Sequence, residues 1–285
     1  MEIIRVPRIM QDTAKVSLLR GKTIGFVPTM GAIHEGHLSL VRRAKQENDI
    51  TVVSIFVNPT QFGPTEDFEN YPRYIYSDTE KLQGEDVDII FIPDTSSIYP
   101  EGFLTYVSVE EISEKLCGAF RPGHFRGVAT VVTKLFNIVK PTRAYFGQKD
   151  FQQTVVIKQF VKDLNMDIDI VVCPTIRERD GLAMSSRNTY LDKNQREASV
   201  IIYKCLSEAA DLIKSGIMDG AHIKKVLQDS LLKERAITGI DYAGIYDPIT
   251  LNELSDIRGD ALLAAAVQMR DTRLIDNILV NLTKR

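Results

Sequence analysis

The first half of the chain alternates short apolar runs with longer amphipathic stretches. Five runs rich in Val, Ile and Phe predict buried strands, at residues 23–28, 50–57, 87–93, 143–146 and 167–174. Amphipathic patterns predict helices between them, at residues 38–47, 78–83, 128–140 and 151–164. Strands buried on both faces that alternate with helices are typical of a parallel sheet. We therefore predict an α/β fold with a doubly wound, Rossmann-like sheet, in which each helix crosses between neighbouring strands.

The pattern changes after the segment TIRERDGLAMSSRNTYLD, residues 175–192. Residues 193–215 predict one long helix and residues 222–233 predict a second. Three apolar runs follow without helices between them, at residues 240–247, 261–269 and 274–282. We predict two domains, a doubly wound domain over residues 1–176 and a smaller α+β domain over residues 177–285.

Composition and charge narrow the class of protein. The 285 residues are 44% hydrophobic and 26% charged, which allows a sizeable buried core. We expect a cytoplasmic protein, because no apolar run is long enough for a membrane span and the N-terminus does not resemble a secretory leader. The net charge of −3 disfavours nucleic acid or a membrane surface as a partner. The cysteines, Cys117, Cys173 and Cys205, are widely spaced and predict structural roles.

The segment GFVPTMGAIHEGHLSLVRRAK carries the strongest chemical signal. A strand ends at Pro28, a glycine-containing turn follows, and a helix begins near His37. Glycines permit close backbone approach, and a helix N-terminus offers free N–H groups, so this outline is typical of a phosphate site. Gly31 and Gly36 have P-loop spacing, but His37 and Leu38 stand where a P-loop has Lys and Ser or Thr. The segment is therefore not a Walker motif.

Two histidines lie within this segment. His34 and His37 are three residues apart, so a helical turn places their imidazoles on one side, where they could donate to phosphate oxygens. A two-histidine metal site and ordinary surface histidines are the alternatives, and Glu35 would point elsewhere on the turn. The spacing alone leaves phosphate contact and these alternatives at about even odds.

Two further polar segments follow predicted strands. In FVNPTQF, Asn58 and Gln61 could bind a hydroxyl group, although Asn-Pro is also a common plain turn. In FGQKDFQQ, Lys149 could neutralise charge in a phosphoryl-transfer transition state, although a solvated lysine at a helix start is more common. Because the carboxyl ends of parallel strands share one edge, we expect the loops after Pro28, Val57, Phe146 and Pro174 to converge on one crevice.

A fourth segment, RERDGLAMSSRNTYL, lies at the junction of the two predicted domains. Ser185, Ser186 and Arg187 follow a glycine-containing turn, and hydroxyls beside a guanidinium suit a polyphosphate. A polar linker is the alternative, which Met184 and Leu191 make less favourable because they interrupt the polar run. A domain junction is also a place where a lid could hinge.

Together these segments resemble a known family. PTMGAIHEGH, FVNPTQF, YPR, GHFRGVATVV, FGQKDFQQ and DGLAMSSRN occur in the order and spacing of the pantothenate synthetase family, within the HIGH-type nucleotidyltransferase superfamily. The resemblance covers about residues 23–192. It implies a homodimeric ligase that uses ATP with Mg²⁺ to adenylate pantoate and then transfers the pantoyl group to β-alanine. Residues 1–176 would form the catalytic domain and residues 177–285 the lid.

The resemblance also implies roles for individual residues. The catalytic residues would be His34, His37, Lys149 and Arg187. ATP would contact Met30, Gly31, Ala32, Ile33, His34, Glu35, Gly36, His37, Gly147, Gln148, Lys149, Asp150, Ile176, Met184, Ser185, Ser186 and Arg187. Pantoate and β-alanine would contact Asn58, Gln61 and Gln153. No metal ligand is assigned, since only Asp78 lies where some relatives carry several acids, and Gln148 replaces an acid that family members often have.

Three other functions compete with this interpretation. A nucleotidyltransferase that passes AMP or CMP to a phosphate acceptor would share the histidine loop but not NPTQF or QKDFQQ. A non-catalytic nucleotide-binding module would be expected to lack one of His34, His37, Lys149 or Arg187, and all four are present. An aminoacyl-tRNA synthetase would need a basic surface that the acidic composition does not provide.

Overall fold

The computed structural model describes residues 1–64 and 66–282, which form two compact units. The first unit comprises Met1–Ser113, Arg121–Gln148 and Gln153–Pro174, and the second comprises Glu114–Phe120, Lys149–Gln152 and the chain from Thr175 onward. Within the described ranges no helix combines the length and apolar character that a membrane span requires. The boundary at residues 176 and 177, as a limit between folding domains, stays a prediction.

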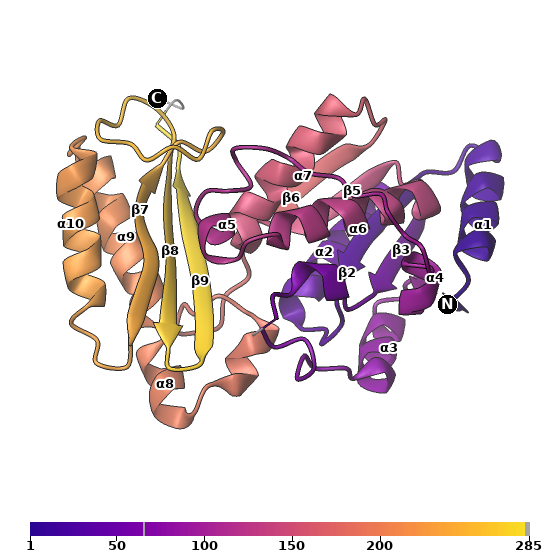
Figure 1. Ribbon diagram of the computed structural model, residues 1–285, viewed down its shortest axis with the longest axis horizontal. Coiled ribbons are helices and arrows are strands. Elements are labelled where there is room, and N and C mark those ends of the chain that lie inside the picture. The colour runs from indigo at the N-terminus through magenta and orange to yellow at the C-terminus, as the bar shows by residue number, and fades with distance from the viewer. Residues whose placement is uncertain (65, 283–285) are drawn as a thin grey trace. The chain divides into compact units, whose positions relative to one another are not determined.

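A parallel six-stranded sheet forms the centre of the first unit (Figure 1). Its strands are β1 (Glu2–Ile4), β2 (Ile24–Thr29), β3 (Ile50–Ile55), β4 (Ile89–Phe91), β5 (Arg143–Gly147) and β6 (Asp169–Cys173), in the order β1-β4-β3-β2-β5-β6. Every pairing between them is parallel, which confirms the predicted doubly wound fold. Strand β1 was not predicted, because three residues are too few to display a hydrophobic period.

Helices α2 (Glu35–Glu47), α3 (Ile75–Gly84), α6 (His124–Val139) and α7 (Phe151–Asp163) lead from each strand to the next between β2 and β6. The prediction that each helix crosses between neighbouring strands was wrong for α6. This helix leads from β4 to β5, which β3 and β2 separate in the sheet. The chain first extends the sheet from β2 towards β4 and must then return to place β5 beside β2. The reversal creates a switch point between β2 and β5, where folds of this type bind ligands.

Apolar side chains cover both faces of this sheet. On one face, Val41 of α2 packs in a cluster with Val27 and Ile90. On the other, the Phe136 ring of α6 meets the Phe26 ring at 6.3 Å between centroids. Phe26 and Val27 serve opposite faces because side chains alternate along a strand. A further helix, α1 (Pro7–Leu19), packs on α6 and was not predicted.

The second unit contains a three-stranded antiparallel sheet, β7 (Gly239–Tyr246), β8 (Ala261–Met269) and β9 (Thr272–Val280), in the order β7-β8-β9. The three predicted strands are confirmed, and helices α9 (Ile201–Lys214) and α10 (Gly220–Leu231) pack against them (Figure 1). The prediction of one long helix over residues 193–215 was wrong, because α8 (Lys193–Ala198) ends before α9 begins. At the break, the Ser199 hydroxyl donates to the Arg196 carbonyl at 2.7 Å and offers the backbone an alternative to the helical pattern.

Candidate active site

The loop between β2 and α2 is held by a buried carboxylate. Gly31 and Ala32 adopt left-handed backbone conformations, with φ of +85° and +50°. Both oxygens of Asp78 in α3 accept backbone amides there, from Ala32 at 2.8 Å and from Ile33 at 2.7 Å. Lys81, one helical turn further along, donates to the Ile33 carbonyl at 2.6 Å. Helix α3 therefore fixes the shape of this loop through two side chains.

The paired histidines cap the start of α2. The His34 ring accepts the Gly36 amide at its Nδ1 atom (3.1 Å), and the His37 ring accepts the His34 amide at its Nδ1 atom (3.3 Å). The two ring centroids are 4.1 Å apart, so the imidazoles lie together as their spacing predicts. An Nδ1 atom that accepts an N–H carries no proton, so each neutral ring has its proton on Nε2. Each imidazole is thus a donor at Nε2.

The amides of this loop are occupied by the chain itself. Sequence analysis predicted that the start of α2 would offer free N–H groups to a phosphate. The amides of Ala32 and Ile33 instead donate to Asp78, and those of His34 and Gly36 donate to the two imidazoles. The prediction was therefore wrong for these four amides, because the side chains that follow the turn satisfy its donors first.

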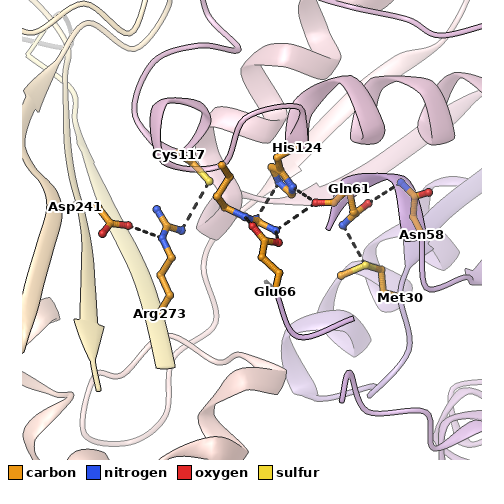
Figure 2. A network of polar contacts seen from close by, with 9 residues as sticks. Met30, Asn58, Gln61, Glu66, Cys117, His124, Asp241 and Arg273 are labelled. Carbon is orange, nitrogen blue, oxygen red and sulfur yellow. Dashed lines mark hydrogen bonds and ion pairs between the residues drawn. The ribbon is translucent and has the colours of Figure 1, made fainter. Parts of the chain in front are cut away.

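After β3, Asn58 and Gln61 form a buried amide pair, shown in Figure 2 with Met30. The Asn58 side chain is 1% exposed and donates to the Gln61 Oε1 atom at 3.0 Å and to the Gly127 carbonyl at 3.1 Å. Gln61 Nε2 in turn contacts the Met30 sulfur at 3.1 Å. Asn58 therefore orients Gln61 within the protein, whereas direct contact of Asn58 with a substrate stays a prediction.

Two residues near the start of α6 hold the main chain of Gln61. His124 donates from Nδ1 to the Gln61 carbonyl at 2.8 Å, and Arg121 donates to the same carbonyl at 3.4 Å. Arg121 also pairs with Glu66, its Nε atom lying 2.8 Å from Oε1. Burial raises the pKa of the Glu66 carboxyl, but the hydrogen bonds and positive charge of Arg121, together with a hydrogen bond from the Gly63 main chain, outweigh it and lower the pKa. Sequence analysis assigned no role to these residues, although GHFRG was among the matching segments.

The second unit contains the predicted lysine. Lys149 follows β5 in a short 3₁₀ turn (Gln148–Asp150), and its side chain is 19% exposed with Nζ 3.7 Å from Asp150 Oδ1. The Lys149 carbonyl accepts a hydrogen bond from Asn277 of β9 at 2.9 Å. Asn277 was not predicted, because an asparagine in a mainly apolar strand carries no signal of its distant partner.

Gln152 and Gln153, which follow Lys149 in the chain, have different environments and belong to different units. Gln152 is buried. Its side-chain Oε1 atom accepts a hydrogen bond from the Cys117 backbone N–H at 2.9 Å, and its Nε2 atom donates to the Lys115 carbonyl at 2.7 Å. Gln153, the predicted substrate contact, is half-buried in the first turn of α7 and belongs to the first unit. Gln152 therefore has an internal role that distinguishes it from its neighbour.

The last predicted segment forms a tight turn that leads into a capped 3₁₀ helix. Met184 donates its amide to the Ile176 carbonyl at 3.0 Å across the turn, and Gly181 adopts a φ of +98° at its tip. The Ser185 hydroxyl accepts the Arg187 amide at 3.3 Å and caps the 3₁₀ helix η3 (Ser186–Tyr190). This turn brings the predicted residues 176 and 184 side by side.

The predicted residues fall into two sets, one in each unit. Those of the first unit are Met30, Gly31, Ala32, Ile33, His34, Glu35, Gly36, His37, Asn58, Gln61, Gly147, Gln148 and Gln153, and those of the second are Lys149, Asp150, Ile176, Met184, Ser185, Ser186 and Arg187. In residues 1–64 and 66–282 no cluster of three or more His, Cys, Asp or Glu side chains could hold a metal ion. The three cysteines are free and buried, in agreement with structural roles.

The loops after β2, β3 and β5 share one edge of the sheet, since β2 pairs with both of the other strands. This arrangement defines the class of doubly wound α/β proteins that bind ligands beyond the carboxyl ends of their strands. Within that class, the chain belongs to the pantoate–β-alanine ligase family, whose model matches residues 2–279.

Individual relatives resemble the whole chain. The sequence is 57% identical over 280 residues to a pantothenate synthetase of Thermodesulfovibrio yellowstonii, which covers 98% of this chain and 100% of that protein. The crystal structure of pantothenate synthetase from Thermus thermophilus matches with a TM-score of 0.93 and 41% identity, over 99% of this chain and 100% of that one. A pantoate–β-alanine ligase from Francisella tularensis, complexed with βγ-ATP and β-alanine, matches with a TM-score of 0.80 and 38% identity, over 98% and 97%.

Proposed function

We propose that this chain joins pantoate to β-alanine at the expense of ATP, by way of a pantoyl adenylate, and releases pantothenate, AMP and pyrophosphate. Its membership of the pantoate–β-alanine ligase family over residues 2–279 is the observation that carries this proposal. The Francisella tularensis relative, which is complexed with βγ-ATP and β-alanine, supports the same substrates here. The enzyme is therefore a ligase that forms a C–N bond.

The chemistry explains the need for ATP. A carboxylate does not acylate an amine directly, because oxide would have to leave. In the first step a carboxylate oxygen of pantoate attacks the α-phosphorus of ATP, and the bond to pyrophosphate breaks. In the second step the neutral amine of β-alanine attacks the adenylate carbonyl, AMP leaves with the bonding electron pair, and the amine loses a proton. A site closed to water protects the adenylate between the two steps.

Charge on the phosphates would be stabilised by four side chains. His34 and His37 would donate from Nε2, the atom that their capping bonds leave protonated. His37 would act as the acid that assists phosphate chemistry. Lys149 and Arg187 would add positive charge as pyrophosphate develops.

The remaining nucleotide contacts we propose in the first unit are Met30, Gly31, Ala32, Ile33, Glu35 and Gly36, through groups other than the four backbone amides that Asp78 and the imidazoles already occupy. The residues next to Lys149 and the second-unit turn would add further contacts. Gly147 and Asp150 would meet the ribose, with Gln148 beside them. Ile176, Met184, Ser185 and Ser186 would complete the nucleotide site.

Pantoate would be held by two glutamine amides. Gln61 presents an amide group fixed by Asn58 and by the Met30 sulfur, so it is oriented before a substrate arrives. We propose that Gln61 and Gln153 bind the pantoate hydroxyls and that Gln61 also contacts β-alanine. A preoriented amide discriminates well between a hydroxyl and a hydrogen, because it cannot turn to replace the hydrogen bond that a missing hydroxyl would have made.

We also propose that the enzyme uses Mg²⁺, assembles as a homodimer and is located in the cytoplasm. The described residues provide no acidic cluster for the ion, and both oxygens of Asp78 accept loop amides. We propose that Mg²⁺ enters with ATP, coordinated by phosphate oxygens and water, as this ion commonly is.

The test is ATP–pyrophosphate exchange with pantoate present and β-alanine absent. The wild-type protein is expected to exchange label only when pantoate is added, and Lys149→Ala is expected to abolish the exchange. No exchange in the wild type, with pantoate and Mg²⁺ saturating, would refute the two-step ligase mechanism and favour a nucleotidyltransferase.

A further inference from the structure

Two consecutive polar residues interrupt the apolar strand β9. Asp276 and Asn277 are each 4% exposed. The Asp276 Oδ1 atom accepts a hydrogen bond from the backbone N–H of Asn277 at 2.8 Å, so the two residues are directly linked. Buried polar side chains of this kind require partners, and the partners of this pair lie far away in the sequence.

Asn277 holds the main chain of the predicted catalytic lysine. Its Nδ2 atom donates to the Lys149 carbonyl at 2.9 Å, across 128 residues of sequence. A lysine side chain is long and flexible, so its ammonium group can be placed reproducibly only if its main chain is fixed. Strand β9 provides a firm support, because it pairs with β8 from Thr272 to Val280.

Asp276 holds the second segment with predicted ATP contacts. Its carboxylate accepts two hydrogen bonds from the Arg177 guanidinium, at 2.6 and 2.9 Å. Arg177 also donates to the Gly181 carbonyl at 3.0 Å and stacks over the Tyr203 ring at 3.7 Å. Arg177 thereby connects β9 to the start of the turn, where Arg177 itself lies, and to the Gly181 carbonyl at the tip of the turn.

We propose that the Asp276/Asn277 pair is a positioning element for nucleotide binding, which fixes Lys149 and the turn of residues 176–184 relative to one another. Both residues act through others and neither touches the substrates. This inference rests on the proposed function, since it takes Lys149 as an ATP contact. It assigns to the C-terminal strand a role that its apolar sequence does not suggest.

A double-mutant cycle on ATP affinity tests the proposal. ATP binding, in the presence of Mg²⁺, is measured by calorimetry for the wild type, Asn277→Ala, Lys149→Ala and the double variant. If Asn277 acts through Lys149, Asn277→Ala weakens ATP binding by about 10-fold in the wild-type background and by less than about 2-fold when Lys149 is already absent. Equal losses in both backgrounds, or no loss in either, overturn the proposal.

Gln228→Ala is the matched control. Gln228 of α10 also donates a side-chain amide to a main-chain carbonyl of this unit, that of Ala243 at 3.0 Å. Its removal is expected to leave ATP affinity unchanged, so a loss of affinity in this control as large as that in Asn277→Ala would identify a general structural effect. If Asn277→Ala does not fold, Asn277→Ser takes its place in the same cycle. Serine keeps a polar side chain at the buried position, but its hydroxyl is too short to reach the Lys149 carbonyl.

The outcomes separate this inference from the proposed function. Absence of pantoate-dependent exchange in the wild type would refute the ligase mechanism whatever the cycle shows. Normal exchange in the wild type together with an additive cycle would refute the positioning role of Asn277 alone.

Discussion

Asp78 shows how a single carboxylate can be misjudged from sequence. Its place after YPR suggests only a relation to magnesium, because some relatives carry several acids there. In the structure it is 1% exposed, and both of its oxygens accept amides from the turn after β2. A carboxylate can satisfy two N–H groups at once, which stabilises the left-handed backbone at Gly31 and Ala32. Asp78 therefore shapes the turn that precedes the histidines.

Replacement of Asp78 by Asn tests this role. One oxygen would remain as an acceptor, but an amide NH₂ would face the other N–H and leave it unsatisfied. We expect a loss of about 1–3 kcal/mol in the free energy of unfolding, measured by urea denaturation, and weaker ATP binding. Asp88→Asn is the control, since Asp88 accepts the Thr51 amide at 2.8 Å near the start of β3. ATP affinity should be unchanged in that variant, and an equal loss in both would contradict a specific role.

Gly127 of α6 is a second residue whose role depends on a close approach. A Cβ atom at this position would overlap the Thr60 carbonyl and lie 2.7 Å from the Gln61 Cα atom. The 3₁₀ turn η1 (Pro59–Gln61) therefore rests directly on the helix backbone. The absence of a side chain at Gly127 sets the position of Gln61.

Gly127→Ala is expected to displace this turn and to raise the KM for pantoate by about 10-fold, with a stability loss of about 1–3 kcal/mol from overpacking. Steady-state kinetics and thermal unfolding measure the two effects. Gly84→Ala is the control, because a Cβ there meets nothing within 4 Å. An unchanged KM for pantoate in Gly127→Ala would show that the turn adjusts without moving Gln61.

At the scale of elements, the N-terminus of α2 combines two functions in one pair of side chains. Its cap is an imidazole, where most helices use Ser, Thr, Asp or Asn, and its capping box is closed by a second imidazole. The histidines thus stabilise the helix and present donors at Nε2. Substitution by Ala removes both functions together, so its effect on activity cannot be assigned to one of them.

His34→Asn separates these functions. Asparagine is a good N-cap residue, so the variant should unfold within about 0.5 kcal/mol of the wild type, whereas His34→Ala should lose about 1 kcal/mol. Both variants should lose pantoate-dependent ATP–pyrophosphate exchange to a similar degree, because both lack the Nε2 donor. Chemical denaturation and the exchange assay test the pair. If His34→Asn retained wild-type exchange, His34 would be a capping residue only.

At the scale of the whole molecule, the assembly remains a prediction from the family resemblance. One chain has a mass of 32.1 kDa, so a homodimer should sediment with about twice that mass at micromolar concentration. Sedimentation equilibrium over a range of concentrations is the measurement. A mass that stays at one chain across that range would rule out the dimer. The exchange assay should be run at the same concentrations, so that activity and assembly can be compared.

The amino-acid sequence alone was sufficient to predict the parallel sheet, the three C-terminal strands and the family. Each of these depends on a pattern that is local in the chain. Strands such as β3 are buried and mainly apolar on both faces. Motifs such as PTMGAIHEGH are recognisable from a few consecutive residues. Short elements such as β1, and the break between α8 and α9, were missed because a few residues give too little pattern.

The support of the site residues became visible only in three dimensions. Asp78 and the loop it holds are 45 residues apart, Gln61 and His124 are 63 apart, and Asn277 and Lys149 are 128 apart. No local sequence pattern marks these partners, since the sequence around an acid, a histidine or an asparagine does not depend on whether that residue makes a distant contact. The order of the strands, and with it the long crossover through α6, also depends on packing between distant segments. Local patterns were enough to predict which residues could perform the chemistry, whereas packing over long sequence separations decides which residues hold them in place.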